Sequence, residues 1–245
     1  MASVNSSGKG IARVAGILYL IVVLTGIFSL AYVPGLLFNW DNAALTFDKI
    51  AASASLFRLS IVSSVICYVT FIFLPLSLYR LLRSVHESRA KLMAVLAIVS
   101  VPVSLINLQN KLSVLSLISK AAYLKSYSVE ELQRQVMFYL HQYDNGILIA
   151  SVFWGLWLLP FGYLVYRSGF LPKLLGILLM AGCFGYLINF WGNMLIPGYA
   201  AIGIAKFVSL PASIGEIGTC LWLLIIGVRS KRIPVIVQAS NLEPS

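Results

Sequence analysis

Charged residues are scarce in this sequence, and acidic residues are the scarcest. Only 11% of the 245 residues are charged, whereas 60% are hydrophobic, and Asp and Glu together number 8. A soluble domain of this length cannot hide so much apolar surface, because its ratio of core to surface is limited. The mean hydropathy of +0.91 therefore predicts a multi-pass integral membrane protein.

Histidine and cysteine are also rare, which excludes several kinds of site. The two histidines, His86 and His141, fall on opposite sides of the membrane in the predicted topology, so they cannot share a metal ion or a haem. The three cysteines, Cys67, Cys183 and Cys220, lie inside apolar runs, as small core residues do, and do not indicate disulfides. We therefore expect neither a metal ion nor another cofactor.

Common catalytic and nucleotide-binding motifs are missing as well. The chain has no Gly-rich loop followed by Lys-Ser or Lys-Thr, no His-Glu-x-x-His and no Gly-x-Ser-x-Gly, which argues against nucleotide-driven transport by this chain alone and against intramembrane hydrolysis. The net charge of +10 does not indicate a nucleic-acid partner, because the basic residues gather at the ends of apolar segments.

Long apolar runs are what the sequence has in abundance. Six of them reach the length of about 20 residues that a helix needs to cross a bilayer. They are Ile11–Val33, Phe57–Leu82, Leu92–Ser116, Asp144–Tyr166, Leu174–Leu195 and Phe207–Val228.

The distribution of Lys and Arg predicts the orientation of these spans. If both termini are cytoplasmic, 11 of the 18 basic residues lie on the inner side, and most of the acidic residues lie on the outer side. This asymmetry follows the positive-inside rule. We expect an all-α bundle of six transmembrane helices at residues 11–228, with cytoplasmic tails at residues 1–10 and 229–245.

The outer loop before the fourth span contains a helix-start signal. Ser128 and Glu131 have the spacing of a capping box, and apolar residues then recur at helical spacing at Val129, Leu132, Val136 and Leu140. The pattern predicts a short amphipathic helix, either lying on the membrane surface or covering an outer cavity.

Polar side chains inside the spans are the candidate functional residues, since ionisable groups in hydrocarbon are costly and usually face the interior of the bundle. At 1.5 Å per residue, Lys111 lies about 7 Å and Asn189 about 9 Å below the outer end of its span, whereas Glu216 lies about 14 Å deep. This depth pattern predicts an outward-facing polar cavity with Glu216 at its floor. The ligand-binding candidates are Glu216, Lys111, Arg58, Asn107, Asn110, Asn189, Asn193 and Asp144.

Each candidate also has a purely structural explanation. Glu216 could form an ion pair with Lys111 or Arg58 instead of binding a ligand. The asparagines could join helices by hydrogen bonds, and the two basic side chains could extend to the outer interface. The sequence leaves these alternatives open.

Several segments carry a resemblance to a known family. The stretches ARVAGILYLIVVLTGIF, ASLFRLSIV, SLYRLLRSV, YRSGFLPKLLGILLMAGCFGYLI and GEIGTCLWLLIIGVR resemble the bacterial multi-pass membrane family known as domain of unknown function 4386. The resemblance runs from about Ile11 to Arg232, and its most specific part is 166–176. By this resemblance Arg13, Arg58, Tyr79, Arg167, Ser168, Gly169, Pro172, Gly176 and Glu216 match the family pattern. The resemblance implies a location in the bacterial plasma membrane and no particular activity.

Three functional hypotheses follow from these observations. In the first, the protein binds a small polar or amphiphilic, lipid-like ligand. A stronger version of this hypothesis adds that the protein also moves the ligand. The nearly aliphatic inner half offers little polar path, which counts against transport of a free solute. In the second, the protein is a membrane scaffold or a regulatory partner. In the third, it is an intramembrane enzyme that uses Glu216. Membrane lipids are also expected as partners, and the sequence does not identify a protein partner.

Overall fold

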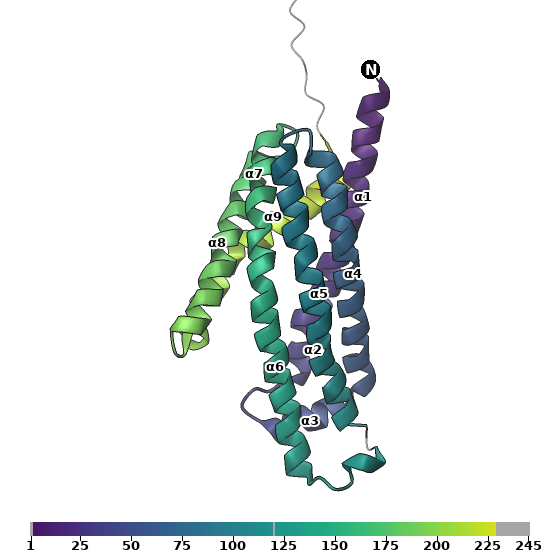
Figure 1. Cartoon of the computed structure of the whole chain (residues 1–245), viewed down its shortest axis with the longest axis vertical. Coiled ribbons are helices and arrows are strands. Elements are labelled where there is room, and N and C mark those ends of the chain that lie inside the picture. Colours follow the sequence, from purple (N-terminus) through teal and green to yellow (C-terminus); the bar gives the residue numbers. More distant parts are fainter. Residues whose placement is uncertain (1, 120, 229–245) are drawn as a thin grey trace, which may run out of the picture.

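The part of the chain that the structure describes contains six helices long and apolar enough to cross a membrane (Figure 1). The computed structural model describes residues 2–119 and 121–228, and these residues contain no β-strand. All six predicted spans are confirmed as helices. As the structure has them, they are Gly8–Leu37, Ala54–Leu82, Glu87–Leu117, Val129–Ser168, Lys173–Leu195 and Ile204–Ile225. The predicted tail at residues 229–245 lies outside the described residues.

The first span changes its helical register near its C-terminal end. Helix α1 (Ala2–Ile27) continues into a π-helical turn, η1 (Phe28–Tyr32), and then into the short helix α2 (Val33–Leu37). In the turn, the Val33 amide donates to the Phe28 carbonyl, five residues back. Pro34 follows and has no N–H to donate. The next carbonyl in this register, that of Ser29, therefore has no backbone donor from residue 34.

The connection between the first two spans contains a helix that the sequence did not predict. Helix α3 (Ala43–Ala52) begins after Asn42, whose side chain accepts a hydrogen bond from the Leu45 amide at 2.9 Å, a typical N-cap. Helices α4 (Ala54–Leu82) and α5 (Glu87–Leu117) follow and form the second and third spans.

The predicted amphipathic helix exists, but it is the beginning of the fourth span and not a separate element. After the 3₁₀ turn η2 (Ala122–Leu124), helix α6 (Val129–Leu156) starts at the predicted capping box of Ser128 and Glu131 and runs without a break into the apolar segment. Helix α7 (Leu158–Ser168) completes the span. The break at Trp157 lies just before Pro160, which cannot donate a backbone hydrogen bond to residue 156.

The last two spans form a closely packed hairpin. Helices α8 (Lys173–Leu195) and α9 (Ile204–Ile225) are joined by the 3₁₀ turn η3 (Tyr199–Ile202). A Cβ atom added at Gly182 would lie 2.7 Å from the Ala212 Cα, and one at Gly185 would overlap the Val208 carbonyl. Small residues allow this close approach.

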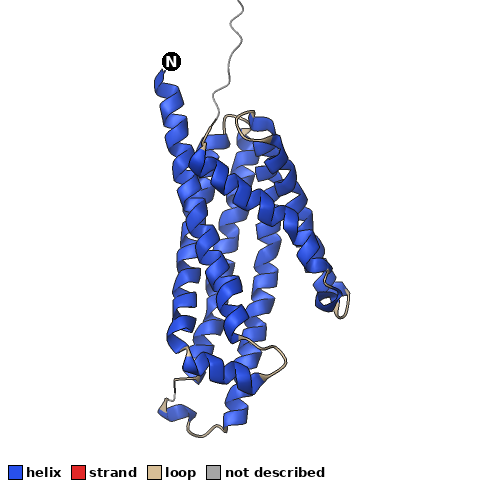
Figure 2. Ribbon diagram, turned by 180° about the vertical axis from the view of Figure 1, so that it is seen from behind, coloured by secondary structure: helices blue, strands red, loops and turns tan. Residues whose placement is uncertain are grey.

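The hairpin stands apart from the rest of the bundle at the end that carries η3. Helices α4, α5 and α6 run side by side, whereas α8 leans away from them towards η3 (Figures 1 and 2). Helix α1 meets α9 at Gly16, where an added Cβ would lie 2.6 Å from the Leu224 backbone nitrogen. The main hydrophobic core fills the bundle, and a second cluster joins α2 and α3 to the N-terminal parts of α4 and α6 and to the C-terminal part of α5.

Candidate functional site

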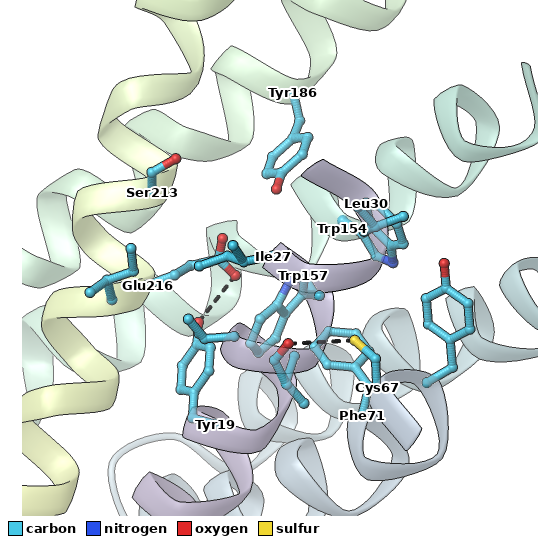
Figure 3. Close-up of a pocket in the computed structure, with 15 residues that line it drawn as sticks. Tyr19, Ile27, Leu30, Cys67, Phe71, Trp154, Trp157, Tyr186, Ser213 and Glu216 are labelled. Atoms are coloured by element: carbon cyan, nitrogen blue, oxygen red, sulfur yellow. Dashed lines mark hydrogen bonds between the residues drawn. The ribbon is translucent and has the colours of Figure 1, made fainter. Parts of the chain in front are cut away.

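The carboxylate of Glu216 lies where α9 faces α1. Its Oε1 accepts a hydrogen bond of 3.1 Å from the hydroxyl of Tyr19 on α1, and Tyr19 itself is almost fully buried at 1% exposure. Figure 3 shows Tyr186 of α8 pointing its hydroxyl towards the same carboxylate from the other side. Glu216 is only partly buried, because one side of it borders a cavity.

This cavity has a volume of about 240 Å³ and is lined by residues of α1, η1, α4, α6, α8 and α9 together with Trp157. Aromatic rings form much of its wall, and Figure 3 shows several of them around the carboxylate. The aromatic lining residues are Tyr19, Tyr68, Phe71, Trp154, Trp157 and Tyr186.

The aromatic wall is held by ring contacts. Trp157 stacks on Phe161 with 5.0 Å between ring centroids, and Phe71 meets Trp157 edge-on at 5.3 Å. Tyr19 contacts both Trp157 and Phe161 at about 6.4–6.5 Å. Offset and edge-to-face contacts of this kind stabilise a fixed arrangement of rings. The wall opposite α9 is therefore preformed.

The cavity reaches the molecular surface between α1 and α9. Among its lining residues, Ile27 of α1 is 52% exposed and Ile217 of α9 is 41% exposed, and Ser213 is exposed as well. In a membrane-spanning bundle, apolar side chains exposed at mid-helix face the lipid chains. The mouth of the cavity is thus on the side of the bundle, and its rim is mostly apolar, with Ser213 as a polar residue.

The second ionisable group of the spans, Lys111, lies in a different place. It is completely buried in α5, and its ammonium donates a 3.2 Å hydrogen bond to the Ser29 carbonyl. The same ammonium lies 4.4 Å from the centre of the Tyr143 ring. The acceptor carbonyl is the one that Pro34 leaves without a backbone donor, so Lys111 completes the hydrogen bonding of the π-turn.

Lys111 and Glu216 do not form an ion pair. Both contact α1, but Lys111 bonds to Ser29 and Glu216 to Tyr19, and ten residues of helix separate these positions by about 15 Å. The other expected partner, Arg58, is exposed on α4. Within the ranges 2–119 and 121–228, the salt bridge that forms is between Lys91 and Glu87, at the surface. The structural ion pair that the sequence left open is therefore excluded.

The asparagines of α5 join helices near Lys111 and do not line the cavity. Asn107 donates a 2.8 Å hydrogen bond to the Tyr143 carbonyl of α6, and Asn110 donates to the Asn107 side chain at 3.0 Å. An added Cβ at Gly146 would overlap the Asn107 side chain. Asn107 thus fills the space that the glycine leaves between α5 and α6.

The asparagines of α8 act in a similar way at the hairpin. Asn189 donates to the Ser209 hydroxyl at 2.8 Å and accepts from the Tyr199 hydroxyl at 2.9 Å, and Asn193 donates to the Asn189 carbonyl at 2.8 Å. These bonds connect α8, η3 and α9. Asp144 of α6 is exposed and lies outside the cavity lining.

The eight candidates are therefore not gathered in one place. Glu216 borders the cavity, and the other seven do not. The expected polar cavity is instead mainly apolar and aromatic. Depth and helix face alone could not reveal this, because residues at one depth on different helices can face different neighbours.

Sequence reasoning missed the aromatic residues around Glu216. Tyr19, Trp154, Trp157 and Tyr186 were not singled out, because aromatic residues are common in spans and their contacts join distant segments. A signal was present in Tyr19 and Tyr186, which lie near the middle of their spans and away from the interfacial belts. A buried tyrosine hydroxyl needs a hydrogen-bond partner, and the carboxylate supplies one for Tyr19.

The fold and the apolar surface define a multi-pass membrane protein of six helical spans. The chain belongs to the family described as Domain of unknown function (DUF4386), whose sequence model matches residues 14–227. An uncharacterised protein of Archaeoglobus fulgidus is 36% identical over 80 residues, which cover 32% of this chain and 44% of that relative. The chain thus spans less than half the length of this relative. No solved structure matches the chain.

Proposed function

We propose that this protein binds a small amphiphilic ligand in the Glu216 cavity, in the plasma membrane of a bacterium. The observation that carries the proposal is a carboxylate in the wall of an apolar, aromatic cavity that opens through a mostly apolar rim. An isolated polar group in such surroundings is costly unless it has a partner. Tyr19 gives Glu216 one hydrogen bond, and a ligand head group would supply the others.

The lateral mouth suits a ligand that arrives from the lipid phase. An amphiphile dissolved among acyl chains would pass between Ile27 and Ile217 with its apolar body against lipid-like surface. Its polar head would then reach Glu216, and its body would replace lipid contacts with contacts to the aromatic wall. Pockets of this kind, mostly apolar with a few placed polar groups, are typical of small-molecule sites.

Thermal unfolding of the full chain in lipid nanodiscs tests this function. The probes are hexyltrimethylammonium, hexanol and hexanesulfonate, which share one chain and differ in head-group charge. A ligand that binds only the folded state raises the unfolding temperature. We expect at least one probe to do so, and the shift to disappear in Val23→Trp, which fills the cavity from α1.

The matched control is Val65→Trp, which adds the same side chain at a position on α4 that is 40% exposed and outside the cavity lining. It should respond as the unmodified protein does. If none of the three probes changes the unfolding temperature, or if Val23→Trp responds as Val65→Trp does, the binding function is wrong.

The alternative is a membrane scaffold or regulatory partner without a small ligand. The hydrogen bonds of Asn107 and Asn189 favour it in part, since these polar groups serve helix packing. They do not explain the space beside Glu216. A scaffold would show no response to any of the three probes.

A further inference from the structure

The cavity beside Glu216 carries charge of one sign. Among the residues described as lining it, Glu216 is the acid, and no Lys, Arg or His is present. Lys111, the buried cation of the bundle, is bonded to Ser29 about 15 Å along α1 from the contact between Tyr19 and Glu216. No basic group of the lining therefore neutralises Glu216, and an anionic ligand would meet an unopposed carboxylate in low-dielectric surroundings.

The lining also does not suit a bare inorganic cation. Such an ion must exchange its water shell for several oxygen ligands. The described residues contain no group of three His, Cys, Asp or Glu side chains that could hold a metal ion. Most of the wall consists of ring and aliphatic carbon, which cannot replace the lost water.

An organic cation meets both demands of this cavity. An alkylammonium group spreads its charge over carbon, so it leaves water at a lower cost than a metal ion. Aromatic faces attract such cations, and sites for quaternary ammonium ions commonly combine several rings. The six aromatic residues of the lining provide rings, and Glu216 provides the opposite charge.

Two of these rings are placed where a ligand can reach them. Trp154 of α6 and Tyr186 of α8 are only partly buried, and both line the cavity. Figure 3 shows Tyr186 above the carboxylate and Trp154 to one side of it. Trp154 contacts the ring of Tyr68, which also lines the cavity, with 6.4 Å between the ring centroids.

We infer that the occupant of this cavity is an organic cation with an apolar body, such as an alkylammonium amphiphile, whose charged head lies between Glu216 and the aromatic wall. The inference rests on the proposed function and specifies its class of ligand. In this arrangement Glu216 selects the sign of the charge, and the rings favour a diffuse cation over a hydrated one.

The test compares ligands of equal shape and different charge. Hexyltrimethylammonium and the uncharged 2,2-dimethyloctane differ only by nitrogen in place of carbon at the branch point, and hexanesulfonate supplies the opposite charge. Dissociation constants are measured by thermal-shift titration of the full chain in zwitterionic phosphatidylcholine nanodiscs, after correction for partitioning into empty nanodiscs. We expect the cation to bind roughly tenfold or more tightly than its neutral analogue.

The variants assign the preference to named residues. Glu216→Gln should weaken binding of the cation by roughly tenfold or more and leave the neutral analogue unchanged. The control Glu130→Gln removes one negative charge at an exposed position of α6 and should change neither constant. Trp154→Leu should weaken binding of the cation several-fold more than Trp154→Phe, which keeps an aromatic face.

The outcomes separate this inference from the function on which it rests. If none of the probes binds, the proposed function fails, and the inference fails with it. If the neutral analogue or the sulfonate binds as tightly as the cation, the cavity is a ligand site, but its occupant is not an organic cation. If Glu216→Gln does not fold, the two Trp154 variants decide, and equal constants for them would overturn the role of the rings.

Discussion

Lys111 and Glu216 are two ionisable groups inside the spans, and the protein surrounds them differently. Lys111 is fully buried, with the Ser29 carbonyl and the Tyr143 ring as partners. Glu216 is partly exposed, receives one hydrogen bond from Tyr19 and borders a cavity of about 240 Å³.

Lys111 thus has its hydrogen-bonding partner within the protein, whereas Glu216 has one hydrogen bond and unfilled space beside it. The Lys111 ammonium and the Ser29 carbonyl satisfy each other. The carbonyl needs this donor because Pro34 has no N–H to donate to it. At Glu216 the nearby groups are hydroxyls and aromatic rings, and space remains. A buried charge is therefore weak evidence of a ligand site until its surroundings are known.

Reversal of the charge at position 111 should have the largest effect. Lys111→Glu would place a carboxylate against the Ser29 carbonyl in a fully buried site. Because an uncompensated buried charge costs about 3–5 kcal/mol, we expect little folded protein, as measured by size-exclusion chromatography of the solubilised chain. Lys111→Met, which is apolar and similar in length, should remain folded. A well-folded Lys111→Glu protein would show that this site is not closed.

The two regions should also differ in how they accept a methyl group. Gly146→Ala would drive a Cβ into the side chain of Asn107, displace its hydrogen bond to Tyr143 and cost about 2 kcal/mol of unfolding free energy. In Gly26→Ala the nearest atom to the new Cβ is the Cys67 sulfur at 3.6 Å, an ordinary contact. This cavity-wall variant should be at least as stable as the unmodified protein, because alanine favours a helix. Denaturant titration measures both variants, and equal losses would contradict the comparison.

The fold followed from the sequence where local signals were strong. The six apolar runs predicted the six spans, and the spacing of Ser128 and Glu131 predicted the start of a helix. The sequence did not predict that α6 is one continuous helix, because its residue pattern changes from amphipathic to apolar along its length. A signal was present, since α6 contains no proline and the break comes only near Pro160. Helix α3 is short and was not distinguished from a loop.

The site was predictable only in part. Glu216 was identifiable because a lone carboxylate in an apolar run is conspicuous by itself. Its surroundings depend on contacts such as that with Tyr19, which is 197 residues away in the chain. The partner of Lys111 is a backbone carbonyl released by Pro34 in a π-turn, and the depth of a side chain in its span does not indicate such a partner.

Loss of a single hydroxyl should give the smallest effect. Tyr19→Phe removes the hydrogen bond to Glu216 and should lower the unfolding free energy by about 1 kcal/mol. Tyr143→Phe should have a smaller effect, because it keeps the ring that lies 4.4 Å from the Lys111 ammonium. Equal destabilisation of the two variants in the same denaturant titration would argue against this assignment.

The most direct test compares the two charged groups within one experiment. The shift in unfolding temperature caused by hexyltrimethylammonium is measured in nanodiscs for Lys111→Met and for Glu216→Gln. If Lys111 is structural and Glu216 borders a ligand site, the shift persists in Lys111→Met and is lost in Glu216→Gln. A shift that persists in Glu216→Gln, or one that is lost in a folded Lys111→Met protein, would contradict the account.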